Sequence, residues 1–200
     1  MAELVQLFLK VFFILTPFFV LSVFISLTRD VSAHTQKILA NRLAMAVLIS
    51  CVVIFLTGRY IFEIFGITLD AFRIGAGSVL FLSAISMVNG GSGGPKRPGT
   101  DDGVINMAVV PLAMPVTVGP GVIGVLLVLG VEHVGLTEKL KVVAAIAMAS
   151  AALWVILRLA RTLGSRLGSQ GMEVIARLTG LFVSAIAAQI IFTGVRNFMA

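Results

Sequence analysis

Residues 111–121 read "PLAMPVTVGPG", and this stretch lies inside an apolar segment long enough to cross a lipid bilayer. It holds three of the chain's six prolines. A proline inside a helix removes a backbone hydrogen bond and costs roughly 3 kcal/mol, and a bilayer offers no water to satisfy the exposed groups. The residue before a proline is pushed out of the helical conformation, so the helix is predicted to break at Met114 and Gly119.

The composition is that of an integral membrane protein. The chain has 200 residues, of which 58% are hydrophobic and 12% charged, and its mean hydropathy is +1.09. Soluble domains carry about 25% charged residues. The net charge of +6 does not indicate nucleic acid as a partner, because Lys and Arg stand at the ends of apolar runs, where they anchor membrane helices. The lipid bilayer is therefore the expected surrounding.

Six apolar segments reach or approach the roughly 20 residues that a spanning helix needs. They are long and continuous, which favours helices over a β-barrel. The fold class is therefore predicted to be all-α, a polytopic membrane protein with six transmembrane helices. The predicted spans are residues 4–27, 38–57, 69–88, 104–130, 142–159 and 175–195.

The middle of the chain is predicted to be a linker between two similar halves. Residues 89–103 read "NGGSGGPKRPGTDDG", a Gly- and Pro-rich stretch of mixed charge, and the flexible linker is placed at 91–103. The first repeat then covers residues 1–90 and the second 104–200, in one membrane domain. Three spans per half is an odd number, so the second half must be inverted relative to the first, as in many secondary transporters.

Internal similarity supports this division, although apolar helices also align by chance. Arg73 aligns with Arg177, and Gly90 with Gly194, each 104 residues further on. At nearly the same spacing, "TPF" in the first half meets "GPG" in the second.

The distribution of positive residues predicts the topology. Three connections on one side hold eight Lys and Arg, and the other side holds four. The richer side is expected to face the cytoplasm, so both termini are expected outside. The eight are Arg29, Lys37, Arg42, Lys96, Arg97, Arg158, Arg161 and Arg166, and the four are Arg59, Lys139, Lys141 and Arg196.

The broken segments are the candidate binding site. A half-helix that starts near Pro120 presents free N–H groups and partial positive charge, which suit a carboxylate. The alternative is a kinked helix without a site, because prolines bend many membrane helices. The candidate substrate-binding residues are Thr16, Pro17, Pro115, Thr117, Gly119, Pro120, Gly121 and Gln189.

Charged residues near helix ends are interpreted in two ways. Arg73 can pair with Asp70, and Arg177 with Glu173, as structural ion pairs. Alternatively, both arginines extend toward the lipid headgroups as anchors, which is also the reading for Lys10.

No catalytic chemistry is predicted. The sequence has no phosphate-binding loop, nucleophile elbow or zinc pattern, so no enzyme, cofactor or metal site is expected.

Four stretches resemble the MarC family of bacterial and archaeal inner-membrane proteins. They are "FISLT" at 24–28, "FGITLDAFRIGAG" at 65–77, "VVPLAMPVTVGPG" at 109–121 and "EVIARLTGLFVSAIAAQIIFTG" at 173–194. The resemblance implies a cytoplasmic (inner) membrane location. Because some relatives are described as transporters of small neutral amino acids, it also implies transport of that kind. The first span departs from the family at Phe19, where a glycine is usual.

Two functions are therefore considered. The first is a secondary transporter of a small solute, such as a neutral amino acid, which works by alternating access with a proton or sodium ion as the coupling ion. The second is a non-transporting membrane scaffold or regulator whose cavity is closed by Phe19. The oligomeric state is left open.

Overall fold

A computed structural model describes residues 2–28, 31–90 and 117–199, and within these ranges the chain is helical. The predicted linker and the helix break at Met114 lie outside the described residues. The helices are α1 (Ala2–Ile14), α2 (Pro17–Leu27), α3 (Ala33–Phe65), α4 (Leu69–Val88), α6 (Pro120–Glu132), α7 (Leu136–Arg158) and α8 (Ala160–Phe198).

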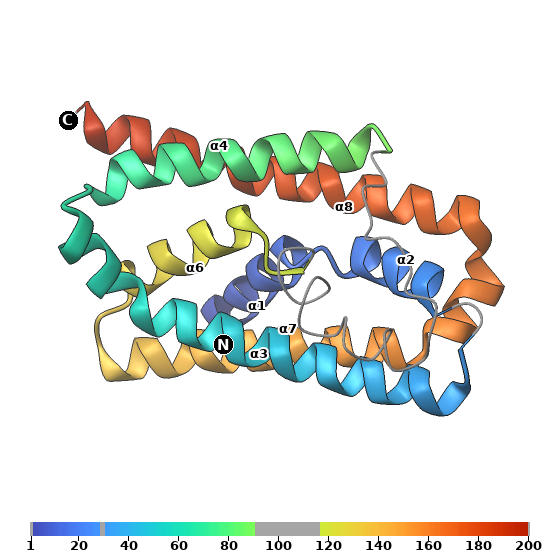
Figure 1. The fold of residues 1–200 in the computed structure, drawn as a ribbon. Coiled ribbons are helices and arrows are strands. Elements are labelled where there is room, and N and C mark those ends of the chain that lie inside the picture. The colour runs from blue at the N-terminus through green and yellow to red at the C-terminus, as the bar shows by residue number, and fades with distance from the viewer. Residues whose placement is uncertain (1, 29–30, 91–116, 200) are drawn as a thin grey trace.

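The helices form a bundle with three short helices in its interior. α4 and α8 lie side by side along one edge, α3 and α7 lie along the opposite edge, and α1, α2 and α6 lie between them (Figure 1). α6 is the most enclosed, since nine of its thirteen residues are buried. The all-helical prediction is confirmed by this arrangement.

Five described segments are long and apolar enough to cross a membrane, and α6 is a shorter apolar helix of 13 residues. α1 and α2 together make one of the five, in agreement with the predicted span 4–27. The exact count of six spans stays a prediction, because much of the fourth lies outside the described residues. α3 is longer than predicted, at 33 residues, because the helix continues beyond the apolar stretch. The 39 residues of α8 are interrupted by a kink at Gly168, where φ is 63° and ψ is −178°, and the part long and apolar enough to span a membrane begins at Gln170.

Local capping explains where the helices begin and end. The Ser32 hydroxyl accepts a hydrogen bond from the backbone N–H of Thr35 at 3.0 Å, and α3 begins there. α3 ends at Gly66, whose φ of 62° is the left-handed conformation that glycine adopts without strain. Thr68 then caps α4 in the same way as Ser32 caps α3, through the N–H of Ala71.

Small residues let α6 approach its neighbours at backbone distance. A Cβ atom on Gly130 would lie 2.2 Å from the carbonyl oxygen of Phe55 in α3, and one on Gly124 would lie 2.3 Å from the Cβ of Ala76 in α4. Close contact through small residues is typical of membrane helices, where the hydrophobic effect does not hold helices together. These contacts seat α6 against α3 and α4.

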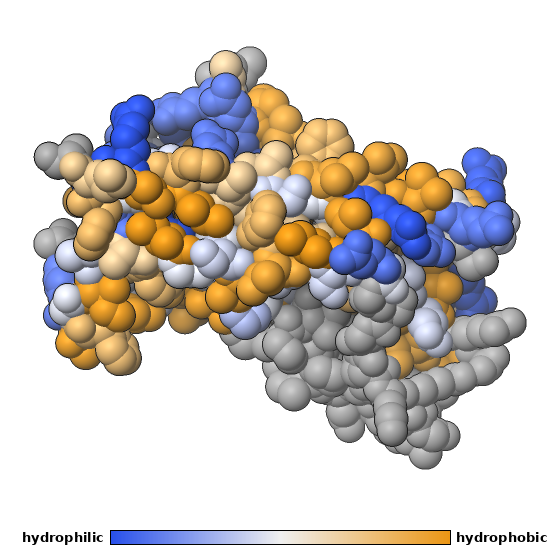
Figure 2. Space-filling model, turned by 90° about the horizontal axis from the view of Figure 1, so that it is seen from above, coloured by the Kyte–Doolittle hydropathy of each residue, from blue (hydrophilic) through white to orange (hydrophobic). Residues whose placement is uncertain are grey.

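The surface has the character that a bilayer requires. The face formed by α4 and α8 is hydrophobic over its middle, with hydrophilic groups gathered toward the ends of the helices (Figure 2). Large apolar side chains such as Leu82, Leu181 and Phe192 are exposed there.

Candidate functional site

The first helix break lies at Thr16. Pro17 has no N–H to donate, and its ring would clash with the carbonyl group four residues earlier, so α1 cannot continue through it. Thr16 takes φ 47° and ψ 55°, and it is the one non-glycine residue with positive φ in the described part of the chain. This conformation costs roughly 1–2 kcal/mol. α2 then starts with Pro17 in its first turn, where proline is well tolerated.

The second break lies at Gly119. This residue is extended, with φ −79° and ψ 176°, and α6 begins at Pro120. Neither Gly119 nor Thr16 caps its helix with a side-chain hydrogen bond. The first N–H groups of a helix have no partner within the helix itself, so both helix starts present backbone donors and partial positive charge.

The two helix starts open into one cavity of about 530 Å³. α2 and α6 both begin near the centre of the molecule and run away from it in opposite directions (Figure 1). The cavity volume falls within the roughly 300–1,000 Å³ of small-molecule sites. The described residues that line it are Ile14, Thr16, Phe19, Leu80, Leu82, Ser83, Ala84, Ser86, Met87, Thr117, Gly119, Pro120, Gly121, Val122 and Val183.

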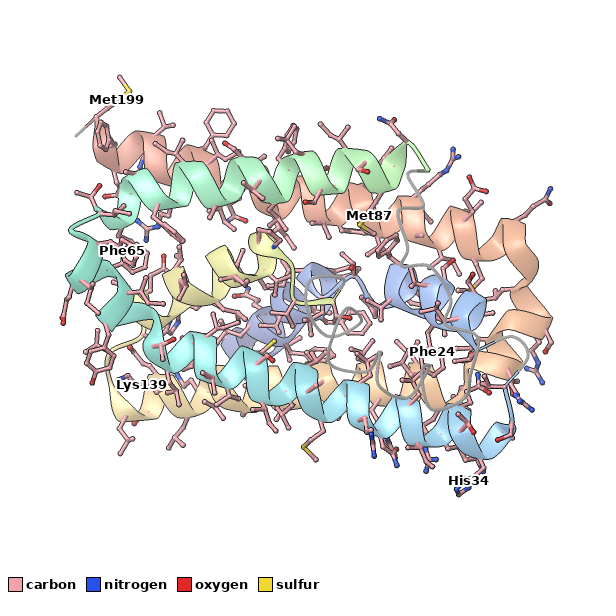
Figure 3. The ribbon with its side chains drawn as sticks, viewed as in Figure 1. Phe24, His34, Phe65, Met87, Lys139 and Met199 are labelled. Atoms are coloured by element: carbon pink, nitrogen blue, oxygen red, sulfur yellow. The ribbon has the colours of Figure 1, made fainter. Side chains whose placement is uncertain are left out.

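The lining is mostly apolar with a few convergent polar groups. The hydroxyls of Thr16 and Thr117 come from the two broken segments, and Ser83 and Ser86 come from α4. Met87 lies at the end of α4 that approaches α2 (Figure 3). A pocket of this kind can bind the apolar part of a small molecule and orient its polar end.

Five of the eight candidate residues line this cavity, namely Thr16, Thr117, Gly119, Pro120 and Gly121. Pro17 is buried behind it and causes the break. Gln189 does not join them, because its side chain is exposed and lines a different pocket. Pro115 lies outside the described residues.

Sequence reasoning missed the residues of α4 and α8 that line the central cavity. Leu80 and Val183 look like ordinary apolar residues, and the two serines of α4 have the spacing of helix-packing residues. One signal was present: Leu80 and Val183 are 103 residues apart, as are Thr16 and Gly119.

The four ion-pair candidates differ in their surroundings. Arg73 is buried and donates hydrogen bonds to Asp70 in its own helix and to Glu132 at the end of α6. Arg177 pairs with Glu173 one turn away on the surface of α8. Glu132 is far away in sequence, so its contact with Arg73 is a result of the tertiary fold.

The sequence was compared with known proteins. It matches the family described as MarC family integral membrane protein over residues 1–199. A UPF0056 membrane protein of Methanocaldococcus jannaschii is 32% identical, with 95% of this chain and 94% of the relative covered. A relative in Aquifex aeolicus is 31% identical, with 98% and 93% covered, and UPF0056 membrane protein YhcE of Escherichia coli is 30% identical, with 96% and 91% covered.

No solved structure matches this chain. The family match and the relatives agree over nearly the whole length, and the relatives are named as membrane proteins of bacteria and archaea. The chain belongs to the MarC family of integral membrane proteins.

Proposed function

We propose that this protein is a secondary transporter of a small zwitterionic solute, of the size and charge of a neutral amino acid. The observation that carries the proposal is the single cavity into which two interrupted helices open. Unwound backbone at membrane depth is tolerated where it lines such a cavity, and interrupted helices in two halves are typical of transporter binding sites.

The electrostatics of the cavity favour a carboxylate. Two helix N-termini meet there, and each carries partial positive charge. In this proposal the backbone N–H groups of Gly119 and Gly121 hold the carboxylate, while Thr16 and Thr117 provide hydroxyls. The apolar residues of α4 and α8 leave room for a small side chain.

Helix positions support two inverted repeats. α2 begins at Pro17 and α6 at Pro120, a spacing of 103 residues, and α3 begins at Ala33 and α7 at Leu136, which is again 103. The contacts also correspond, because α6 packs on α4 while α2 packs on α8. Thus α2 of the first half packs on the last helix of the second half, and α6 of the second half packs on the last helix of the first half.

The cavity itself is lined in corresponding pairs. Four pairs of its lining residues are 103 positions apart, which is expected if the cavity lies on a two-fold axis between the halves. They are Ile14 and Thr117, Thr16 and Gly119, Phe19 and Val122, and Leu80 and Val183. A site on such an axis can be exposed to either side by small opposite movements of the two halves, which is alternating access.

Uptake into liposomes tests the proposal. Purified protein is reconstituted, and labelled alanine, glycine and serine are offered with a proton gradient, a sodium gradient or neither. We expect uptake above empty liposomes, with one gradient increasing it. Thr117→Val should raise KM several-fold because it removes a lining hydroxyl, whereas Thr57→Val, which alters an exposed hydroxyl on α3, should leave KM unchanged.

The scaffold alternative is decided by the same assay. Phe19 lines the cavity, and a large side chain there could hinder solute. If the wild type equals empty liposomes while Phe19→Gly takes up solute, the natural cavity is closed and the protein is not a transporter. Phe18→Gly, on the same helix but outside the cavity lining, controls for the glycine itself.

A further inference from the structure

A second pocket lies beside the central cavity, toward the face of the bundle where α1 begins and α6 ends. Its volume is about 540 Å³. Its lining combines apolar side chains with several polar ones. The residues are Glu3, Gln6, Leu7, Leu9, Lys10, Phe13, His133, Ile186 and Gln189.

The two pockets are lined by neighbouring positions on the same two helices. On α1, Phe13 lines the second pocket and Ile14 the central cavity. On α8, Ile186 lines the second pocket, and Val183, one turn earlier, lines the central cavity. The second pocket therefore lies next to the central cavity, separated from it by α1 and α8.

Lys10 is the residue that gives this pocket its chemistry. It is half-buried within an apolar helix, four residues or about 6 Å along the axis before the helix ends at Ile14. Within the described residues it forms no ion pair. The charged groups in electrostatic range are Glu132 and Arg73, and Arg73 pairs with both Glu132 and Asp70. An ionisable residue inside a membrane helix is expensive to keep and is functional by default.

Glu3, the acidic residue among those that line the pocket, does not pair with Lys10. The carboxylate of Glu3 accepts a hydrogen bond from the Nζ of Lys141 at 2.6 Å, which joins α1 to α7. The remaining polar side chains are His133, Gln6 and Gln189, and the last two are amides that can donate hydrogen bonds. The pocket thus combines the ammonium group of Lys10, which has no direct ion-pair partner among the described residues, with amide donors beside an apolar wall.

The proposed sequence repeat does not carry a cation in both halves. In the repeat proposed above, the residue 103 positions after Lys10 is Ala113, which carries no charge. One half is therefore built without the ammonium group that the other half keeps.

We propose that the second pocket is a binding site for the carboxylate of a small organic anion or zwitterion, with the ammonium group of Lys10 as its cation. Gln6 and Gln189 donate to the same carboxylate, and the apolar wall contacts the rest of the molecule. A role of this site in solute uptake would rest on the proposed transport function, whereas the binding itself does not.

Equilibrium binding of labelled propionate to the protein in phosphatidylcholine nanodiscs tests this site. Lys10→Met should weaken binding by at least about tenfold, because a hydrogen bond to a charged group is lost. Methionine suits a membrane helix, so the variant is expected to fold. Lys10→Arg should retain binding, and so should Lys139→Met, which removes a lysine at the same end of the molecule but outside this pocket (Figure 3).

Equal propionate affinity in wild type and Lys10→Met would overturn the assignment, even if the wild type transports alanine. Conversely, Lys10-dependent propionate binding without any uptake would support this site and refute the transport function. If phosphatidylglycerol displaces propionate from the wild type and binds tightly only when Lys10 is present, the occupant is a lipid phosphate, which would also overturn the assignment.

Discussion

At the scale of single residues, the backbone is shaped by where proline and glycine stand. Pro17 prevents α1 from continuing, and Thr16 accepts a left-handed conformation at a cost of roughly 1–2 kcal/mol. Such strain persists only where the surrounding structure imposes it, and it is common at functional sites. Here the strained residue lines the central cavity.

Glycine at residue 130 is required by close packing, and this gives a residue-scale prediction. Gly130→Ala would place a Cβ 2.2 Å from the backbone oxygen of Phe55, so α3 and α6 must separate. We expect a loss of about 1–3 kcal/mol in the free energy of unfolding, measured by titration with SDS from a mild detergent.

Gly75→Ala is the matched control. It lies in α4 with no atom within 4 Å of the added Cβ, and alanine favours the helix by up to about 1 kcal/mol. The packing argument is wrong if both variants unfold at the same SDS concentration.

At the scale of helices, two arginines that look equivalent in sequence have different roles. The side chain of Arg73 is 10% exposed and joins α4 to the end of α6 through Glu132, whereas that of Arg177 is 49% exposed and contacts Glu173 within α8. Removing one partner of a buried ion pair leaves a charge uncompensated, but exposed pairs contribute little.

The pair of variants Arg73→Met and Arg177→Met checks this difference. We expect Arg73→Met to lower the free energy of unfolding by about 1–3 kcal/mol, because its carboxylate partners are 28% and 30% exposed, and Arg177→Met to lower it by less than about 1 kcal/mol. SDS titration followed by circular dichroism measures both. Equal losses would mean that the contact between α4 and α6 does not depend on Arg73.

At the scale of the whole molecule, the connections separate to two ends of the bundle. His34 lies at one end, and Phe65 and Lys139 lie at the other (Figure 3). The hydrogen bond from Arg161 to the backbone oxygen of Val31, at 2.9 Å, ties the start of α8 to the connection before α3. This end holds several of the positive residues that predict the cytoplasmic side.

Cysteine labelling of intact cells tests that orientation. Cys51 is buried in α3, so Cys51→Ala gives a background without reactive thiols. In that background, Val134→Cys should react with an impermeant maleimide from outside, and His34→Cys should react only after the membrane is permeabilised. Both positions are exposed. The reverse pattern would show that the bundle is inserted the other way round.

Sequence reasoning reached much of the fold because the bilayer constrains it strongly. Apolar length predicted the spanning helices, and the span at 69–88 agrees with α4 at both ends. The breaks at Pro17 and Pro120 follow from proline's missing N–H, which is a local property. Gln189 was placed in the central cavity because it lies deep in an apolar segment, but which side of a helix faces a cavity depends on its neighbours.

The sequence by itself determined the membrane class, the helical segments and the positions where two of them break, because these depend on hydropathy and on local backbone chemistry. Only the tertiary structure decided that both breaks open into one cavity, that Glu132 pairs with Arg73, and that Lys10 lines a second pocket. Those contacts join residues that are far apart in the sequence, and their geometry is set by how closely glycine-containing helices pack.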